Sequence, residues 1–322
     1  MEHILSAPYD ALYEEYLDYK KTRVSAQGFE SARTMAYRII KWFELEELLP
    51  WEISVADAVR FKKEAGERIR KDGKPVSAGT VQNYMKAVRS FYRYLIQTEK
   101  VKSNPFEEVK NPRLPKHISR NVLTEPQMNR LLEKLASFSE IEDTDRRLRR
   151  YRCHVLSEFL YATGLRIAEA GSLVDANIDL ANRKVFVPEG KGGKSRTAFL
   201  TGYACDVLEE YMKNGRKAVF GNYWRPEAEK LFGASKSRLA AVLNEELFEV
   251  CSELEIPVIT SHGFRHSLGT HLLQNGCDMR YIQVILGHES IGTTQVYTNV
   301  YKEDLRNSID EFHPRNYRRK EI

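Results

Sequence analysis

The chain has 322 residues, of which 42% are hydrophobic, and its 50 Lys and Arg residues face 45 Asp and Glu residues. This length and composition predict a soluble globular protein with two domains. No stretch approaches the 18 apolar residues of a membrane span, and the N-terminus lacks the apolar core of a signal peptide, so neither bilayer insertion nor export is expected. A net charge of +5 is weak evidence for a nucleic-acid partner, so a basic surface must come from how the charges are distributed.

The four cysteines are widely spaced and include no CxxC pair. They are Cys153, Cys205, Cys251 and Cys277. This pattern predicts reduced thiols in the core of a cytoplasmic protein and offers no zinc site. His262 and His266 have the four-residue spacing of a helical metal site, but no carboxylate or Cys ligand lies near them in the sequence. We therefore expect no metal and no cofactor.

From about Ala7 to Lys100, apolar residues recur at helical spacing between polar turns, which predicts four helices. The fourth is expected to start near Ser77. Its polar positions carry three cations, Lys86, Arg89 and Arg93. Two interpretations of these cations stay open: a solvated basic face, or a helix that faces a groove of DNA.

The segment after Asn104 contains three prolines, which exclude a helix, and a series of cations without neighbouring acids. We therefore predict an extended basic linker at residues 109–120, between an N-terminal helical domain at 1–108 and a second domain at 121–322. The linker is either a solvated tether or a strap along a DNA backbone. Its candidate DNA contacts are Arg113 and Lys116.

The second domain opens with a helix that Thr124 caps, and a run of five arginines follows. The run comprises Arg146, Arg147, Arg149, Arg150 and Arg152. We interpret it as a loop that is either solvated or faces phosphates, and the sequence does not choose between the two.

A helix then leads to the segment TGLRIAEAGSL, in which Arg166 precedes Glu169 by three residues. An arginine at such a helix start commonly pairs with the acid that follows it. Residues 177–201 alternate as strands around a GKGGK loop that contains Lys191 and Lys194. This loop is not a P-loop, because strands flank it on both sides and the GxxxxGK[ST] spacing is absent.

The stretch from Ser261 to Asn299 brings four chemically reactive side chains near expected helix ends: His262, Arg265, His288 and Tyr297. Apolar residues four apart give the first helix a buried face, with Ser261 as its N-cap, so that His262 and Arg265 share another face. A second short helix ends at Leu286-Gly287-His288, and Tyr297 follows nine residues later. A guanidinium and imidazoles suit the pentavalent transition state of a phosphate, and a tyrosine hydroxyl can be a covalent nucleophile.

The combination HGFR, then LGH, then a tyrosine nine residues on resembles the C-terminal signature of the tyrosine recombinase (phage integrase) family. The Thr-Gly-Leu-Arg turn at Arg166 resembles the turn that holds the family's first catalytic arginine, and the likeness covers nearly the whole chain. The resemblance implies a mainly α fold that clamps DNA with two domains. These are an N-terminal four-helix core-binding domain and an α-rich catalytic domain with a small antiparallel β-sheet.

The resemblance also implies a reaction, in which DNA strands are cleaved and rejoined at specific sites through a 3′-phosphotyrosyl intermediate and a Holliday junction. The implied catalytic residues are Arg166, Lys191, His262, Arg265, His288 and Tyr297. The arginines and His288 would bind the phosphate oxygens, and His262 would move the tyrosine proton. Lys191 would protonate the leaving 5′-oxygen, with Lys194 as its rival. DNA contact is implied for Lys86, Arg89, Arg93, Arg113 and Lys116.

The implied partner is double-stranded DNA with paired inverted half-sites, on which four copies assemble, with a related recombinase or accessory protein as a further partner. The terminal helix carries an apolar stripe of Leu305, Ile309 and Phe312. By resemblance the stripe docks into a neighbouring subunit, and the alternative is docking onto its own domain. The end EFHPRN resembles the Xer type, which resolves chromosome dimers, and a plasmid, transposon or phage integrase fits the same pattern.

Two other classes compete with this prediction. A type IB topoisomerase would use similar residues as a monomer and relax supercoils. A catalytically idle DNA-binding relative would keep the domains and lose the chemistry, but the complete set of candidate catalytic residues argues against it. No membrane partner is expected.

Overall fold

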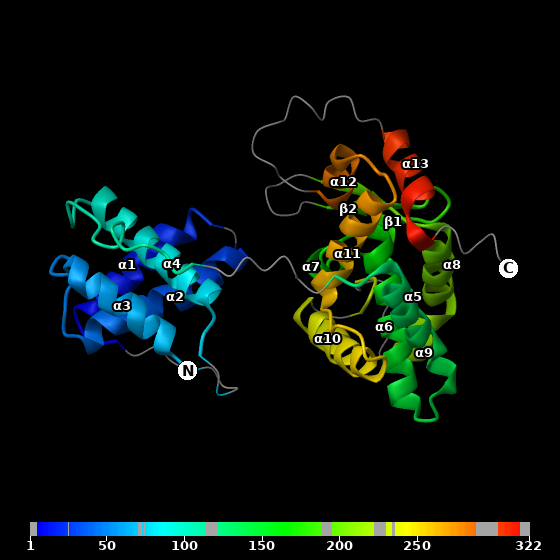
Figure 1. Ribbon diagram of the computed structural model, residues 1–322, viewed down its shortest axis with the longest axis horizontal. Helices are drawn as coiled ribbons and strands as arrows, with labels where there is room; N and C mark the ends of the chain where they lie inside the picture. Colours follow the sequence, from blue (N-terminus) through cyan, green and yellow to red (C-terminus); the bar gives the residue numbers. More distant parts are fainter. Residues whose placement is uncertain are drawn as a thin grey trace. The chain divides into compact units, whose positions relative to one another are not determined.

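The computed structural model describes residues 5–24, 26–69, 73, 75–113, 122–188, 195–221, 230–233, 236–287 and 302–315. The chain forms two compact units, Met1–His117 and Ile118–Ile322. The first is built from helices, and the second combines helices with one small antiparallel sheet (Figure 1). The predicted fold class, mainly α with a small antiparallel sheet, is confirmed.

Four helices make up the described part of the first unit. They are α1 (Tyr9–Lys21), α2 (Ala26–Leu45), α3 (Val55–Glu67) and α4 (Ala78–Gln97). Ser77 caps α4, as predicted, because its side chain accepts a hydrogen bond from the Thr80 amide. Aromatic side chains fill the space where α1, α2 and α3 meet α4, and Phe43, Phe91 and Tyr92 are fully buried there.

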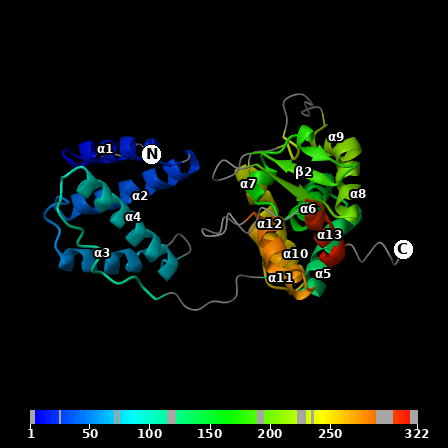
Figure 2. The ribbon, with the colours of Figure 1, turned by 90° about the horizontal axis from the view of Figure 1, so that it is seen from above.

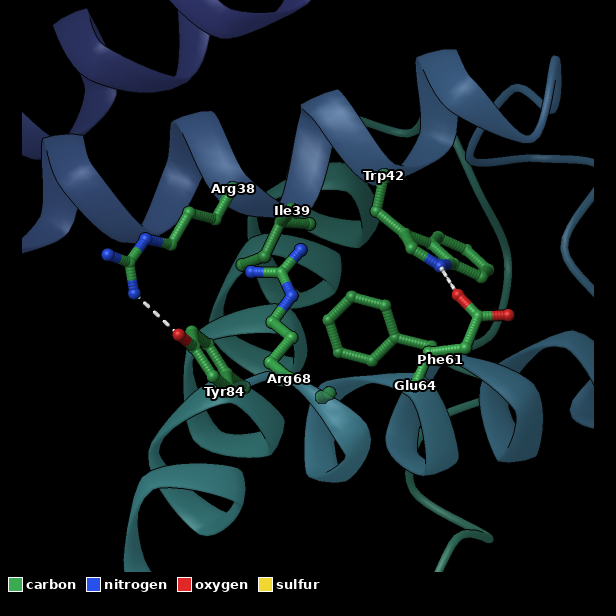
Figure 3. A pocket seen from close by; sticks show the side chains of 8 residues that line it. Arg38, Ile39, Trp42, Phe61, Glu64, Arg68 and Tyr84 are labelled. Atoms are coloured by element: carbon green, nitrogen blue, oxygen red, sulfur yellow. Dashed lines mark hydrogen bonds between the residues drawn. The ribbon is translucent and has the colours of Figure 1, made fainter. Parts of the chain in front are cut away.

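Polar contacts hold α2 against α3 and α4 around a small cavity of about 40 Å³ (Figure 3). The indole Nε1 of Trp42 donates to Glu64 Oε2 at 2.7 Å, and the Arg38 guanidinium donates to the Tyr84 hydroxyl. The Arg68 guanidinium lies 5.7 Å from the centroid of the Tyr84 ring. Two exposed arginines, one on α2 and one directly after α3, therefore meet at one tyrosine.

The second unit contains a longer series of helices. They are α5 (Glu125–Ala136), α6 (Thr144–Thr163), α7 (Ile167–Ala170), α8 (Gly202–Glu210), α9 (Arg216–Phe220), α10 (Lys236–Glu253), α11 (Ser261–Gln274), α12 (Met279–Leu286) and α13 (Lys302–Phe312). Helix α6 is buried from Cys153 to its end, with α5, α8, α10 and α11 packed around it (Figures 1 and 2). All four cysteines are buried free thiols, as predicted.

The sheet has the order β1-β2-β3, with both pairs antiparallel. Its strands are β1 (Ile178–Asp179), β2 (Lys184–Val187) and β3 (Arg196–Phe199). Val185 pairs with Ala198, and both side chains face the core. Within the described ranges, no helix is long and apolar enough to cross a membrane.

The arginine run at 146–152 is helical, so the predicted loop is wrong. Asp143 caps α6 by accepting from the Arg146 amide at 2.6 Å. Two of the arginines then reach one buried carboxylate on α10: Arg149 Nε lies 2.9 Å from Glu246 Oε2, and Arg150 pairs with Oε1 of the same residue. The acids that neutralise the run lie across the helix interface, about 100 residues later in the chain, so the local sequence does not show them.

The C-terminal segment is anchored in its own unit. Leu305 and Ile309 of α13 are buried in the core of the second unit. This arrangement matches the alternative in which the apolar stripe docks onto its own domain and not into a neighbouring subunit. Beyond α13, Arg315 forms a buried two-point ion pair with Glu158 of α6, with Nε 3.1 Å from Oε2. His313 donates from Nε2 to the Tyr161 carbonyl at 3.1 Å, because a carbonyl can only accept.

A second chain of hydrogen bonds continues from the same tyrosine. The Tyr161 hydroxyl lies 2.7 Å from His271 Nδ1, and His271 Nε2 lies 2.8 Å from the Leu123 carbonyl. The carbonyl requires a proton on Nε2, so Nδ1 of the neutral ring accepts from the tyrosine. Burial lowers the pKa of His271, which favours this neutral form. The network joins α6, α11 and the start of α5.

Arg315→Ala should lower the free energy of unfolding by about 3–5 kcal/mol, because it leaves the buried Glu158 carboxylate without its partner. Urea unfolding followed by circular dichroism measures this loss. Glu158→Gln in the Arg315→Ala background should recover part of it, since a neutral amide costs less to bury than a charge. A loss below about 1 kcal/mol would mean that the pair contributes no more than an exposed salt bridge.

Candidate active site

The end of α6 determines where the first candidate arginine lies. Gly164 ends this helix in the left-handed region, at φ 63°. A Cβ at this position would lie 2.8 Å from Leu286 and 3.0 Å from Leu268, so the turn packs directly against α12 and α11. Arg166 follows two residues later as the N-cap residue of α7.

Glu169 holds two arginines at this turn. Its carboxylate accepts from the backbone amide of Arg166 at 2.8 Å and from the guanidinium of Arg166 at 3.0 Å. Arg196, at the start of β3, donates to both oxygens of the same carboxylate, at 3.0 and 2.8 Å. Burial raises the pKa of Glu169, but the hydrogen bonds from Arg196 and Arg166 outweigh burial and hold it at about 2. Glu169 is therefore an anion at neutral pH.

Arg265 of α11 completes a cluster of three arginines. Its side chain is buried, and one nitrogen donates to the Gly164 carbonyl at 2.8 Å. Burial, with the charges of Arg166 and Arg196, lowers its pKa to about 10, so the group is still a cation at neutral pH. The cluster thus sets three positive charges against one carboxylate.

Two guanidinium nitrogens in this cluster are buried without a hydrogen-bond partner among the described residues. They are Nη2 of Arg265 and Nε of Arg196. An unpaired buried donor costs about 1–3 kcal/mol, and more when the group is charged. An anion bound here would offset this cost, and a phosphate, with several acceptor oxygens, suits guanidinium donors. The arrangement therefore has the chemistry of an oxyanion site.

His262 lies in the first turn of α11, is exposed, and contacts His266 with its ring centroid 5.2 Å from that ring. The predicted N-cap is off by one residue: Ser261 is the first residue of α11, and Thr260 holds the cap position without a side-chain hydrogen bond. The Ser261 amide is satisfied instead by Asn244 of α10, at 2.8 Å. Helix α11 therefore starts against α10, which the local sequence cannot reveal.

The other predicted catalytic residues lie outside the described residues. They are Lys191, His288 and Tyr297, and the rival Lys194 is also outside. Two described residues, Arg196 and Gly287, lie close to them in the sequence. Arg196 stands at the start of β3, soon after the lysine-bearing loop, and Gly287 closes α12 immediately before His288.

Sequence reasoning missed Arg196. An arginine at the start of a strand has no local pattern that marks a site. The one available signal was its position, two residues after Lys194.

On the first unit, Lys86 and Arg93 are exposed on α4, as the predicted basic face requires. Lys86 lines a groove of about 440 Å³ between α1, α2 and α4, together with Asn83 and Lys20. Burial lowers the pKa of Lys20, and the charges of Arg93 and Arg23 lower it further, so several cations gather beside this groove. Such a cluster of like charges attracts a polyanion.

Arg89 is used inside the unit. Its guanidinium donates to the carbonyls of Phe106 and Val109, at 2.9 and 2.6 Å, and to the side chain of Asn111 at 2.9 Å. Arg89 therefore holds in place the segment that follows the helical bundle. It does not extend into the groove. Of the two linker candidates, Arg113 is exposed and Lys116 lies outside the described residues.

A family model described as the phage integrase family matches residues 121–304. The chain is 35% identical over 250 residues to a protein named tyrosine recombinase XerC from Halalkalibacterium halodurans, covering 73% of this chain and 76% of that protein. It is 32% identical over 321 residues to tyrosine recombinase XerC from Bacillus licheniformis, with 96% and 97% covered. A solved structure of the Tn1549 transposon integrase with circular intermediate DNA shares the fold, at TM-score 0.65 and 20% identity, covering 94% of this chain and 99% of that one.

Acid should remove the stability that Glu169 contributes. Because its folded pKa is about 2 against an ordinary 4.5, the contribution is present above about pH 4.5 and is lost as the pH falls toward about 2. The free energies of unfolding of the wild type and Glu169→Gln, measured with urea at several pH values, should therefore converge across this window. Curves that stay parallel would contradict the assignment.

Proposed function

The chain belongs to the phage integrase family as a Xer-like tyrosine recombinase, and we propose that the arginine cluster around Glu169 is the phosphate-binding half of its active site. The activity is site-specific DNA recombination, so the anion is the scissile phosphate. One observation carries the proposal: the buried Nη2 of Arg265 has no hydrogen-bond partner among the described residues, in a cluster of three arginines around one carboxylate. The relatives are named recombinases, so a topoisomerase is not favoured.

Arg166 and Arg265 act on the non-bridging oxygens of that phosphate, where negative charge develops in the transition state. Arg265 is held by the Gly164 carbonyl, and Arg166 is held by Glu169. Both groups are therefore oriented before DNA arrives, so little reorganisation is needed when the phosphate binds. A buried cation also acts more strongly than one in water, because the surrounding dielectric constant is lower.

The remaining roles complete the reaction. The Tyr297 hydroxyl loses its proton with help from His262 and attacks phosphorus, and the bond from phosphorus to the 5′-oxygen breaks. Lys191, or its rival Lys194, gives that oxygen a proton, and His288 hydrogen-bonds the phosphate. The 3′-phosphotyrosyl ester conserves the energy of the broken bond. Attack by the 5′-hydroxyl of a partner strand reverses the step and leads to a Holliday junction.

The two compact units support a division of labour. We assign residues 1–108 to a core-binding domain, 109–120 to a linker and 121–322 to the catalytic domain. Four copies assemble on double-stranded DNA with paired inverted half-sites, with a related recombinase or accessory protein as a further partner. The buried free thiols suit the reducing cytoplasm.

The groove beside α4 is the DNA surface of the first unit. Lys86 and Arg93 contact phosphates there, and Lys20 adds a third cation. Arg113 and Lys116 extend the contact along the linker. Arg89 acts indirectly, because it fixes the segment that enters the linker.

Tyr297→Phe should leave half-site binding intact and abolish covalent capture of DNA, because the variant lacks only the nucleophilic hydroxyl. The measurement is a denaturing gel of the protein with a nicked duplex that contains its target site, found first by nuclease protection. The matched control is Tyr301→Phe, which should still form the adduct. Capture by Tyr297→Phe but not by Tyr301→Phe would move the nucleophile to Tyr301.

Lys86→Ala and Arg93→Ala should each weaken half-site binding and reduce the slope of log K against log salt by about one, because each removes one phosphate contact. Arg89→Ala is the matched control. It should leave the salt slope unchanged and lower the free energy of unfolding, since its acceptors belong to the protein. Fluorescence anisotropy at several salt concentrations and urea unfolding separate the two. A reduced salt slope for Arg89→Ala would show that Arg89 contacts a phosphate.

A further inference from the structure

We propose that Arg196 is a positioning residue for strand cleavage: it holds the Glu169 carboxylate that orients Arg166, and it supports the Gly287 turn that ends α12. This inference rests on the proposed function of the arginine cluster. In this proposal a residue of β3 fixes the position of α7 relative to the end of α12.

The first contact is with Glu169. Arg196 donates through Nη1 and Nη2 to the two carboxylate oxygens, at 3.0 and 2.8 Å. This two-point geometry fixes the plane of the carboxylate, which a lysine ammonium cannot do. The same oxygens accept from the amide and guanidinium of Arg166. The direction of the Arg166 side chain, which is 41% exposed, therefore depends on how Arg196 holds Glu169.

The second contact is with the turn after α12. Gly287 ends that helix in the left-handed region at φ 61°. A Cβ there would lie 2.8 Å from Arg196 Nε and 3.0 Å from its Cδ, so the arginine side chain packs directly on the glycine backbone. Glycine satisfies both the conformation and the close approach. Arg196 thus links β3, α7 and the end of α12 through one side chain.

The charges argue against an ordinary structural ion pair. Where arginines of this unit only join two helices, as between α6 and α10, the charges are matched, because three arginines pair there with three glutamates. Here the carboxylate serves Arg166 and Arg196, and Arg265 lies close enough for both cations to lower its pKa. Excess positive charge in a largely buried place is unfavourable without an anion. The cluster therefore fits a residue that arranges cations for a bound phosphate.

The test compares Arg196→Lys with a control at a matched ion pair. Arg216→Lys is the control, because Arg216 also binds both oxygens of a carboxylate and its side chain is 9% exposed. Three quantities are measured: thermal stability, half-site affinity, and the single-turnover rate of covalent adduct formation on the nicked duplex. Arg196→Lys should keep half-site affinity within about twofold and cleave roughly 10- to 100-fold more slowly, since small misplacements cost about that much. Arg216→Lys should cleave at the wild-type rate.

A second comparison separates positioning from folding. If Arg196 acts through Arg166, the double variant Arg166→Ala/Arg196→Lys should cleave no more slowly than Arg166→Ala alone. Arg196→Met repeats the comparison without the charge should the lysine variant unfold. The proposal would be overturned if Arg196→Lys cleaved at the wild-type rate, or if its rate loss were explained by lost affinity or stability. It would also be overturned if the rate losses of the two single variants multiplied in the double variant. An absence of adduct with the wild type would instead overturn the proposed function.

Discussion

The pairing of one carboxylate with two arginines is the constraint on which the candidate site depends. Glu169 is anionic because Arg196 and Arg166 stabilise its charge more than burial opposes it. In turn, the carboxylate keeps two guanidinium groups close together where their mutual repulsion would separate them. Arg265 adds a third cation whose position is set by a backbone carbonyl rather than by an acid. The excess of positive charge therefore has a fixed geometry before any phosphate enters.

Helix α6 supplies the frame for this geometry. Its last turn ends at Gly164, whose carbonyl holds Arg265 and whose turn places Arg166. The same helix carries Glu158, which binds the C-terminal segment through Arg315. The first half of the helix is tied to α10 by Arg150 and Glu246. Because every residue of its second half is buried, α6 transmits changes in packing directly to the arginines.

Features that depend on neighbours in sequence were predictable. Thr124 caps α5 and Ser77 caps α4 as their sequences indicate, and apolar periodicity predicts the helices of the first unit. Motif spacing also located Arg166 and Arg265, which the fold brings to one place. The features that could not be predicted depend on distant partners: Arg315 pairs with a glutamate 157 residues away, and Arg150 with one 96 residues away. Arg196 belongs to this second kind, because its partner lies on another element.

The same distinction explains why net charge is a poor guide to where this protein binds DNA. The densest arginine run, at 146–152, is largely neutralised by the glutamates of α10 or satisfied by backbone carbonyls. Arg89 likewise uses its donors on its own chain. By contrast, Lys20 lies near Arg23 and Arg93 and bonds only to the neutral Ser90 among the described hydrogen-bond partners. A small formal charge of +5 is thus compatible with local clusters of cations, since other cations pair with acids inside the fold. What distinguishes the candidate site is its charge balance, three arginines around one carboxylate, and that balance exists only once the fold has decided which acids are near.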